Sequence, residues 1–298
     1  EWLLMKNKTV LFFISLLLLL FISSVIYNVF FIDSAEKTTI LYDDNGEVIK
    51  GPPYPPTVIP PFGTDRGGDN IALRLLGGFQ YTFLFVIVTT LIRILFGGLL
   101  SYLLVFPLNK TSKWIQLTFV PFTYFPAFIL VLYFTGPLNF ISDIFTFWEL
   151  ILLQAVIVIL VGIPVITNTI TNEMRLILKN DFIKSASTLG ASNGHIFFKH
   201  IIPVLKSRFL LITLQQTTIS FILLLHLGAF GYYIGGGQKS AVNEEGRILS
   251  MSGEWGGMIG EAKVELTSGA PWIFFIPLAV ATLLLICINI SIKKLQNK

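Results

Sequence analysis

The chain contains 298 residues, of which 54% are hydrophobic and 13% are charged, and its mean hydropathy is +0.76. Because soluble domains carry about 25% charged residues, this composition excludes a soluble globular protein and predicts an all-α integral membrane protein. The single cysteine, Cys287, excludes a disulfide within the chain, and the three histidines do not cluster, so no metal site is expected. The net charge of +4 is distributed as membrane topology requires, so no nucleic-acid partner is expected.

The N-terminal region combines an apolar run with a proline-rich segment. Residues 1–4 precede Met5 and are left out of the fold prediction as a tag remnant or an upstream start. Residues 1–8 are expected in the cytoplasm, and residues 9–31 are expected to form a first transmembrane helix that is not cleaved. Residues 32–78 are expected outside the cell, where clustered prolines favour an extended polyproline II spacer.

Residues 79–290 are expected to form the main transmembrane domain, and residues 291–298 a cytoplasmic tail. Residues 173–206 are the predicted cytoplasmic loop of this domain, and residues 231–270 are its predicted outer loop. The predicted spans are 79–106, 114–135, 150–168, 209–230 and 271–290.

Charge fixes the expected orientation. With both termini in the cytoplasm, the inner side carries thirteen basic and three acidic residues, whereas the outer side carries seven basic and fourteen acidic residues. Basic residues concentrate on the cytoplasmic side of membrane proteins. The sequence therefore predicts six transmembrane helices with both ends inside, and it places the 173–206 loop in the cytoplasm.

Two blocks in the outer segments have a specific pattern. The first reads PFGTDRGGD at 61–69 and continues as RLLGG at 74–78. The second reads EWGGM at 254–258 and SGAPW at 268–272. On local chemistry alone the first block indicates a capped turn, because Asp and Thr bond nearby amides and glycine allows the bend. The triple glycine at 235–237 lacks the Gly-Lys-Ser/Thr ending of a phosphate loop and indicates a flexible turn.

These blocks resemble the C-type membrane subunit of oligopeptide and dipeptide ABC importers, in the peptide/nickel permease family. The resemblance implies a type I ABC-importer-like fold and a non-catalytic permease in the bacterial plasma membrane. It also implies a homologous second permease subunit, two ABC ATPase subunits that bind the ATP, and an extracellular substrate-binding protein. The chain departs from the family pattern near Phe221, where an acidic residue is expected, and residues 238–252 read as an insertion.

Residues 181–203 read DFIKSASTLGASNGHIFFKHIIP and resemble the EAA loop, which in ABC importers couples the membrane subunit to an ATPase. We expect a short helix up to Leu189, a turn at 190–194, and a second helix at 195–202 that Pro203 ends. Lys184 stands where the family has an acid. The alternative is an ordinary amphipathic hairpin. The expected coupling residues are Lys184, Ser185, Ala186, Leu189, Gly190, Ala191, Ser192, His200 and Pro203.

Four polar residues inside spans are candidates for the translocation path. Arg93 is charged and lies deep in a span, where a charge costs about 2.5–3.5 kcal/mol and needs a compensating group. That group could be water, a helix carbonyl, an acid of the partner subunit or the substrate. Thr213, Thr217 and Ser220 form a stripe at helical spacing, which predicts a face turned to a partner or a wet path. The alternative is that these hydroxyls bond carbonyls of their own helix.

Two other functions remain open at this point. A nickel or metal-chelate importer of the same family would have the same topology. A membrane-embedded enzyme or a regulatory protein would belong to a different class. An enzyme of this kind should bring paired acids or a His-Glu-x-x-His helix to membrane depth, whereas the acids here lie in loops or at span ends. The chain also has no Gly-x-x-x-x-Gly-Lys-Ser/Thr sequence, so ATP hydrolysis is assigned to partner subunits.

Overall fold

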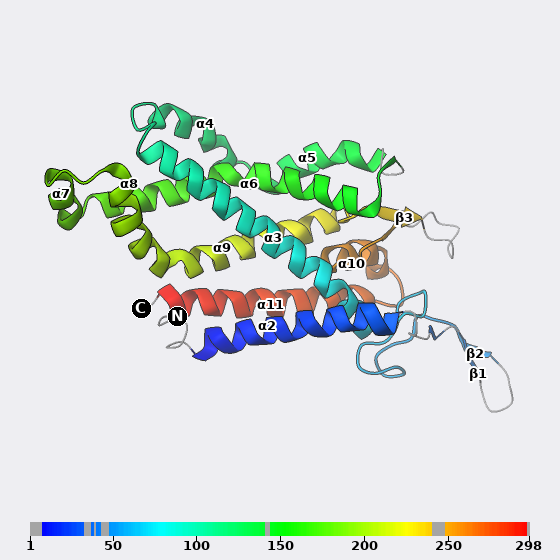
Figure 1. The fold of residues 1–298 in the computed structure, drawn as a ribbon. Helices are drawn as coiled ribbons and strands as arrows, with labels where there is room; N and C mark the ends of the chain where they lie inside the picture. The colour runs from blue at the N-terminus through cyan, green and yellow to red at the C-terminus, as the bar shows by residue number, and fades with distance from the viewer. Residues whose placement is uncertain are drawn as a thin grey trace.

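The computed structural model describes residues 8–32, 37–38, 40–42, 48–140, 144–239 and 248–296. The predicted all-α membrane fold is confirmed, because the chain is mostly helical and its long helices are apolar (Figure 1). In chain order, the elements are α2 (Lys8–Ile26), η1 (Tyr27–Phe31), β1 (Leu41–Tyr42), β2 (Val48–Lys50), α3 (Ile71–Val105), α4 (Ser112–Tyr124), α5 (Ala127–Phe140), α6 (Phe147–Leu178), α7 (Asp181–Thr188), α8 (Asn193–Ile196), η4 (Phe197–Ile201), α9 (Ile202–Ala229), β3 (Gly237–Lys239), β4 (Ile248–Ser250), α10 (Trp255–Glu261), η5 (Ala262–Leu266) and α11 (Trp272–Gln296).

Five helical segments of the described chain are long and apolar enough to cross a membrane. They are α2 with η1, α3, α6, α9 and α11. Where a single span was expected at 114–135, the structure has α4 and α5, which meet at an angle of 87°. Pro126 has no N–H to offer the carbonyl of Phe122, and Phe125 is extended, with φ −81° and ψ 133°. The described chain therefore has six spans if the bent pair crosses once.

The long helices also extend past the apolar windows seen in the sequence. Helix α6 continues to Leu178, beyond the expected end at 168, and α9 begins at Ile202, before the expected start at 209. The extra turns of α6 are amphipathic, and they bury Met174 and Ile177. Hydropathy detects only the part of a helix that lies in the membrane. A helix can extend beyond that part into water as long as one of its faces stays packed.

Helix α3 lies at the centre of the fold, where it packs against α6, α9 and α2. Helix α11 runs beside α2 and α9 in Figure 1. On the outer side, the short helix α10 fits against the end of α9 with almost no space between the backbones. A Cβ on Gly228 would lie 2.0 Å from the carbonyl oxygen of Gly256. Only glycines allow this approach, which makes α10 a rigid cap on the bundle.

Glu254 begins the α10 cap as a completely buried acid. Its carboxylate accepts hydrogen bonds from the backbone N–H groups of Gly257, at 2.7 Å, and Ile234, at 3.4 Å. Burial raises the pKa of Glu254 to about 7, and the two N–H groups oppose that rise only in part. The next residue, Trp255, donates its indole N–H to the carbonyl oxygen of Leu75 at 2.9 Å. Glu254 therefore links the cap to the loop before it, and Trp255 links the cap to the start of α3.

The pH dependence of stability is expected to report on Glu254. Its folded pKa of about 7 exceeds the ordinary value of 4.5, so the folded state binds the proton more tightly than the unfolded state. The resulting stabilisation, about 3 kcal/mol, is complete below about pH 4.5 and is lost as the pH rises through about 7. Glu254→Gln should remove this part of the pH dependence, measured as the midpoint of thermal unfolding in detergent. Asp181→Asn is the control, because the Asp181 side chain is 96% exposed. An unchanged slope in E254Q would contradict this assignment.

Candidate functional site

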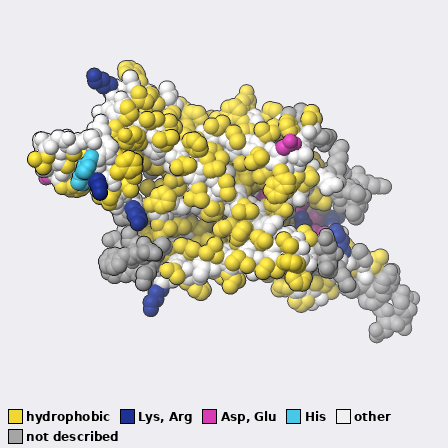
Figure 2. Space-filling model, in the orientation of Figure 1, with side chains coloured by type: hydrophobic (Ala, Val, Ile, Leu, Met, Phe, Trp, Pro, Cys, Tyr) yellow, Lys and Arg dark blue, Asp and Glu magenta, His cyan; other side chains and the backbone are white. Residues whose placement is uncertain are grey.

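The predicted coupling loop lies at the end of the molecule that holds both termini (Figure 1). Helices α7 and α8 project there beyond the ends of α6 and α9, whereas the β-hairpins lie at the opposite end. Figure 2 shows hydrophobic side chains over the middle of the visible face, with Lys, Arg and His side chains at the end that carries the loop and basic side chains beside acids at the opposite end. This distribution is the one expected of a bundle whose loop end faces the cytoplasm.

One set of apolar side chains anchors the loop, and another set faces water. Three isoleucines, at positions 183, 196 and 201, are buried in one cluster with the last turns of α6. Leu189 is 88% exposed at the tip of the turn, and it has exposed phenylalanines on either side in the sequence. A surface of this kind on a rigid support is typical of a protein docking site. The exposed apolar side chains are Phe182, Leu189 and Phe198.

The turn between α7 and α8 depends on Gly190. Its φ of +87° lies in the left-handed region, and a Cβ added there would meet nothing within 4 Å. Backbone conformation alone therefore favours glycine at this position. Ser192 begins α8, and its hydroxyl accepts a hydrogen bond from the N–H of His195 at 3.3 Å.

The other expected coupling residues have local roles in the loop. Lys184 pairs with Asp181 at 2.9 Å on the exposed face of α7, so the unexpected positive charge has a nearby partner. An exposed pair of this kind contributes less than about 1 kcal/mol. Ser185 donates its hydroxyl to the carbonyl of Asp181. Ala186 and Ala191 are half-buried under the loop, and the ring of His200 lies 5.8 Å from that of His195, centre to centre.

The expectation that Pro203 ends the second helix is wrong. The helix passes through a π-helical turn, η4, and continues as α9 to Ala229. In η4 the N–H of Ile202 bonds the carbonyl of Phe197, five residues back. This shift in pairing places Pro203 in the first turn of α9, where a missing N–H is tolerated. The second helix of the predicted coupling loop is therefore connected to the membrane span of α9 without a break.

Arg93 in α3 is 2% exposed, and each of its three guanidinium nitrogens donates a hydrogen bond within the chain. Its Nε and Nη2 atoms donate to the carbonyl oxygen of Val158 in α6, at 3.1 and 2.5 Å. Its Nη1 atom donates to the hydroxyl of Ser220 in α9 at 2.9 Å, and the Thr90 hydroxyl meets Ser220 at 3.1 Å. Of the compensating groups considered for this charge, the structure shows a helix carbonyl. In this conformation Arg93 joins three spans.

Gly162 makes room for the guanidinium of Arg93. A Cβ at position 162 would lie 2.2 Å from Nε and 2.5 Å from Cζ of Arg93. One turn further along each helix, a Cβ on Gly97 would lie 2.4 Å from Ile166. Helices α3 and α6 therefore approach each other through two glycines, one on each helix.

The hydroxyl stripe of α9 is also satisfied inside the chain. Thr213 donates to the carbonyl of Phe209 at 2.9 Å, and Thr217 to that of Thr213 at 2.8 Å, as the alternative interpretation of the stripe requires. Thr217 lines a cavity of about 40 Å³ among apolar residues of α2, α3 and α11. In this conformation Thr217 and Ser220 therefore face the interior of the subunit.

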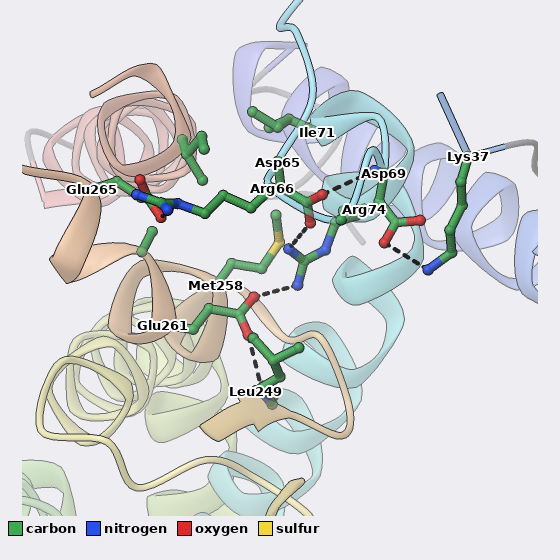
Figure 3. A pocket seen from close by; sticks show the side chains of 14 residues that line it. Lys37, Asp65, Arg66, Asp69, Ile71, Arg74, Leu249, Met258, Glu261 and Glu265 are labelled. Atoms are coloured by element: carbon green, nitrogen blue, oxygen red, sulfur yellow. Dashed lines mark hydrogen bonds and ion pairs between the residues drawn. The ribbon is translucent and has the colours of Figure 1, made fainter. Parts of the chain in front are cut away.

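At the outer end, ion pairs join the two sequence blocks (Figure 3). Arg74 lies between two acids, Asp65 at 2.6 Å and Glu261 of α10. Arg66 pairs with Glu265 of η5 at 2.8 Å, and these side chains line a cavity of about 210 Å³. The capped turn expected from the first block is present, since Asp65 accepts from the N–H of Asp69. Sequence reasoning missed the contact across the fold, although the opposite charges of the two segments were a usable signal.

Residues 93–298 match the family described as binding-protein-dependent transport system inner membrane component. The chain belongs to this family. The permease is therefore a multi-pass membrane subunit of an ABC importer, and members of its family are transport proteins rather than enzymes. The matched region begins at Arg93 and includes the coupling loop. No curated protein matches the sequence closely enough to refine this assignment.

Replacing Gly162 with alanine is expected to destabilise the permease by about 1–3 kcal/mol, because the new methyl group would overlap the Arg93 guanidinium. Gly98→Ala on α3 is the matched control, since the nearest atom to its added Cβ lies 4.0 Å away. Thermal unfolding of the two purified variants in detergent would measure the difference. If the two variants were equally stable, the close approach of Gly162 to the Arg93 guanidinium would not require a glycine.

Arg74→Met is expected to cost about 3 kcal/mol, because it leaves two largely buried carboxylates without their cation. Lys37→Met removes a mostly exposed partner of Asp69 and should cost less than about 1 kcal/mol. Protease sensitivity of the outer segments, together with thermal unfolding, would compare the two. If Lys37→Met lowered stability as much as Arg74→Met, the burial of an ion pair would not determine its contribution to stability.

Proposed function

We propose that this permease forms half of a translocation path for peptides and couples it to separate ATPase subunits through residues 181–203. The observation that carries the proposal is the loop itself. Its tip exposes Leu189, and Phe182 and Phe198 are exposed elsewhere on the loop, while buried isoleucines fix the loop to the ends of α6 and α9. A force applied to this loop would pass directly into two spans, because α9 continues from it without a break.

The proposed assembly contains a homologous second permease subunit, two ABC ATPase subunits and an extracellular substrate-binding protein. ATP would bind to the ATPase subunits, and this chain would contribute neither a nucleotide site nor a catalytic residue. The membrane would be the bacterial plasma membrane. Family membership supports the importer class and the kinds of partner, and the loop supports the point of coupling.

Peptides are favoured as cargo by the two outer sequence blocks. The blocks are nearly two hundred positions apart in the sequence, yet they meet through Arg74 with Glu261 and through Trp255 with Leu75. Trp272 adds a third connection, since its indole N–H donates to the carbonyl of Thr64 at 3.3 Å. The two blocks that carry the resemblance to peptide permeases therefore fold as one structural unit. A nickel or metal-chelate importer is the second candidate, and uptake of labelled peptides against nickel by the reconstituted complex would separate the two.

Gly190→Ala is expected to uncouple transport while leaving the permease inserted and assembled. The left-handed φ of Gly190 costs an L-residue about 1–2 kcal/mol, so the tip should move to relieve it. Gly194→Ala is the matched control, because its Cβ also meets nothing within 4 Å and its φ is not left-handed. Peptide uptake and substrate-stimulated ATPase activity would be measured in proteoliposomes. Normal coupling in both variants would contradict the assignment of this loop.

A further inference from the structure

A cavity of about 420 Å³, lined by both polar and apolar side chains, lies between α4 and α6, close to the coupling end. Arg175 of α6 holds the two helices together beside it. Its guanidinium donates to the hydroxyl of Ser112 at 2.7 Å and to Oε1 of Gln116 at 3.1 Å. The polar uncharged side chains that line the cavity are Gln116, Thr123, Tyr124, Asn168, Thr169 and Asn172.

Unpaired hydrogen-bonding atoms gather at this junction. Within the part of the chain that the structure describes, three buried side-chain polar atoms lack a hydrogen-bond partner: Nε2 of Gln116, Oδ1 of Asn168 and Oγ1 of Thr171. Two of these residues line the cavity, and Thr171 lies one turn from Asn168 on α6. Because Arg175 occupies the oxygen of the Gln116 amide, its unpaired end is a donor, whereas Asn168 offers an acceptor. Buried unpaired groups are costly, so the polar groups of this junction are not fully satisfied within the described chain.

The cavity also adjoins the break between α4 and α5. Thr123 and Tyr124 end α4 and line the cavity, and Tyr124 is 84% exposed. A broken helix at membrane depth is tolerated where it is buried in protein or lines a water-filled space, but not against lipid. Amide and hydroxyl side chains facing hydrocarbon would likewise be unfavourable. The break and the polar side chains beside it therefore favour contact with water or a polar solute over contact with lipid.

The side chains that line the cavity favour a peptide over a metal cation. Of the residues that line the cavity, Lys113 alone is charged, and none is an acid, a histidine or a cysteine. Metal cations bind carboxylate, imidazole and thiolate groups, so this lining disfavours a free cation. Amide and hydroxyl groups match the C=O and N–H of a peptide unit, and an ammonium group attracts a carboxylate.

We infer that the α4–α6 cavity is a passage site for the peptide main chain on the inner half of the translocation path. Its amide and hydroxyl side chains replace the hydrogen bonds that water gives to peptide groups, and Lys113 attracts the C-terminal carboxylate. The inference rests on the proposed function. The proposed site lies between α6 and α4. It therefore replaces the α9 stripe as the candidate path, because Thr217 and Ser220 of that stripe face the interior of the subunit.

Cysteine labelling of the complete transporter in proteoliposomes tests access to the cavity. Cys287 is exposed and is first replaced by serine. Asn172→Cys and Thr123→Cys should then react with a water-soluble thiol reagent, and a transported peptide should slow the reaction during ATP turnover. Leu283→Cys on α11 is the control for a lipid-exposed apolar position, since Leu283 is 61% exposed, and it should stay inert.

Transport by matched threonine variants tests function. The hydroxyls of Thr169 and Thr282 both donate to the carbonyl four residues back, at 3.0 and 2.7 Å, but only Thr169 lines the cavity. Thr169→Val should lower peptide uptake about fivefold, the effect of losing about one hydrogen bond. Thr282→Val should leave uptake unchanged. Lys113→Gln should reduce uptake of a free-acid peptide more than that of its C-terminal amide, each relative to the unmutated transporter.

Three results would overturn the inference. One is a cavity cysteine that never reacts with the thiol reagent. The same conclusion follows if the cysteine reacts but peptide does not slow the reaction, because a site that holds only water would behave in this way. Another is equal uptake by the Thr169 and Thr282 variants in a transporter that imports peptide normally. Either would leave the proposed function intact. An unmutated complex that assembles and hydrolyses ATP but imports no peptide would instead contradict the proposed function, and the inference with it.

Discussion

The arrangement of the membrane helices depends on one buried cation. Arg93 extends from α3 across a glycine of α6, bonds the carbonyl of Val158 twice, and reaches Ser220 of α9. A guanidinium suits this task because its planar fork donates in several directions from one rigid group. Its desolvation would oppose insertion if the partners were absent, so the three spans are stable mainly in the packed arrangement. The central contact of the bundle is thus polar, within a subunit whose surface is mostly apolar.

The two ends of the bundle are built on different principles. At the outer end, ion pairs and glycine contacts fix α10, η5 and the segment before α3 as one cap. At the coupling end, isoleucines hold a loop whose tip remains exposed. Charges suit the first task because they pair specifically over a long sequence separation. Apolar groups suit the second, because they bury area against the helices and leave other apolar groups ready for a partner.

Between these ends, helix α6 contacts Arg93, the α4–α6 cavity and the predicted coupling loop. It receives Arg93, carries one wall of the α4–α6 cavity, and ends under the coupling loop. Because α9 also continues into the loop through a π-helical turn, a displacement of the loop would act on α6 and α9 together. Packed interfaces of this kind move between discrete arrangements rather than bending continuously. The unpaired atoms at Gln116 and Asn168 lie where α4 meets α6.

The sequence by itself determined the membrane class, the orientation, the places of the long helices and the turn at Gly190. These follow from hydropathy, charge asymmetry and glycine chemistry, which act locally along the chain. It also carried the family resemblance in its outer blocks and its loop. Only the tertiary structure decided that 114–135 is a bent pair, that the helix continues through Pro203 rather than ending there, and that Arg93 bonds a carbonyl of α6. Each of these depends on which distant groups satisfy a backbone or a charge, and one sequence read along its length does not specify those partners.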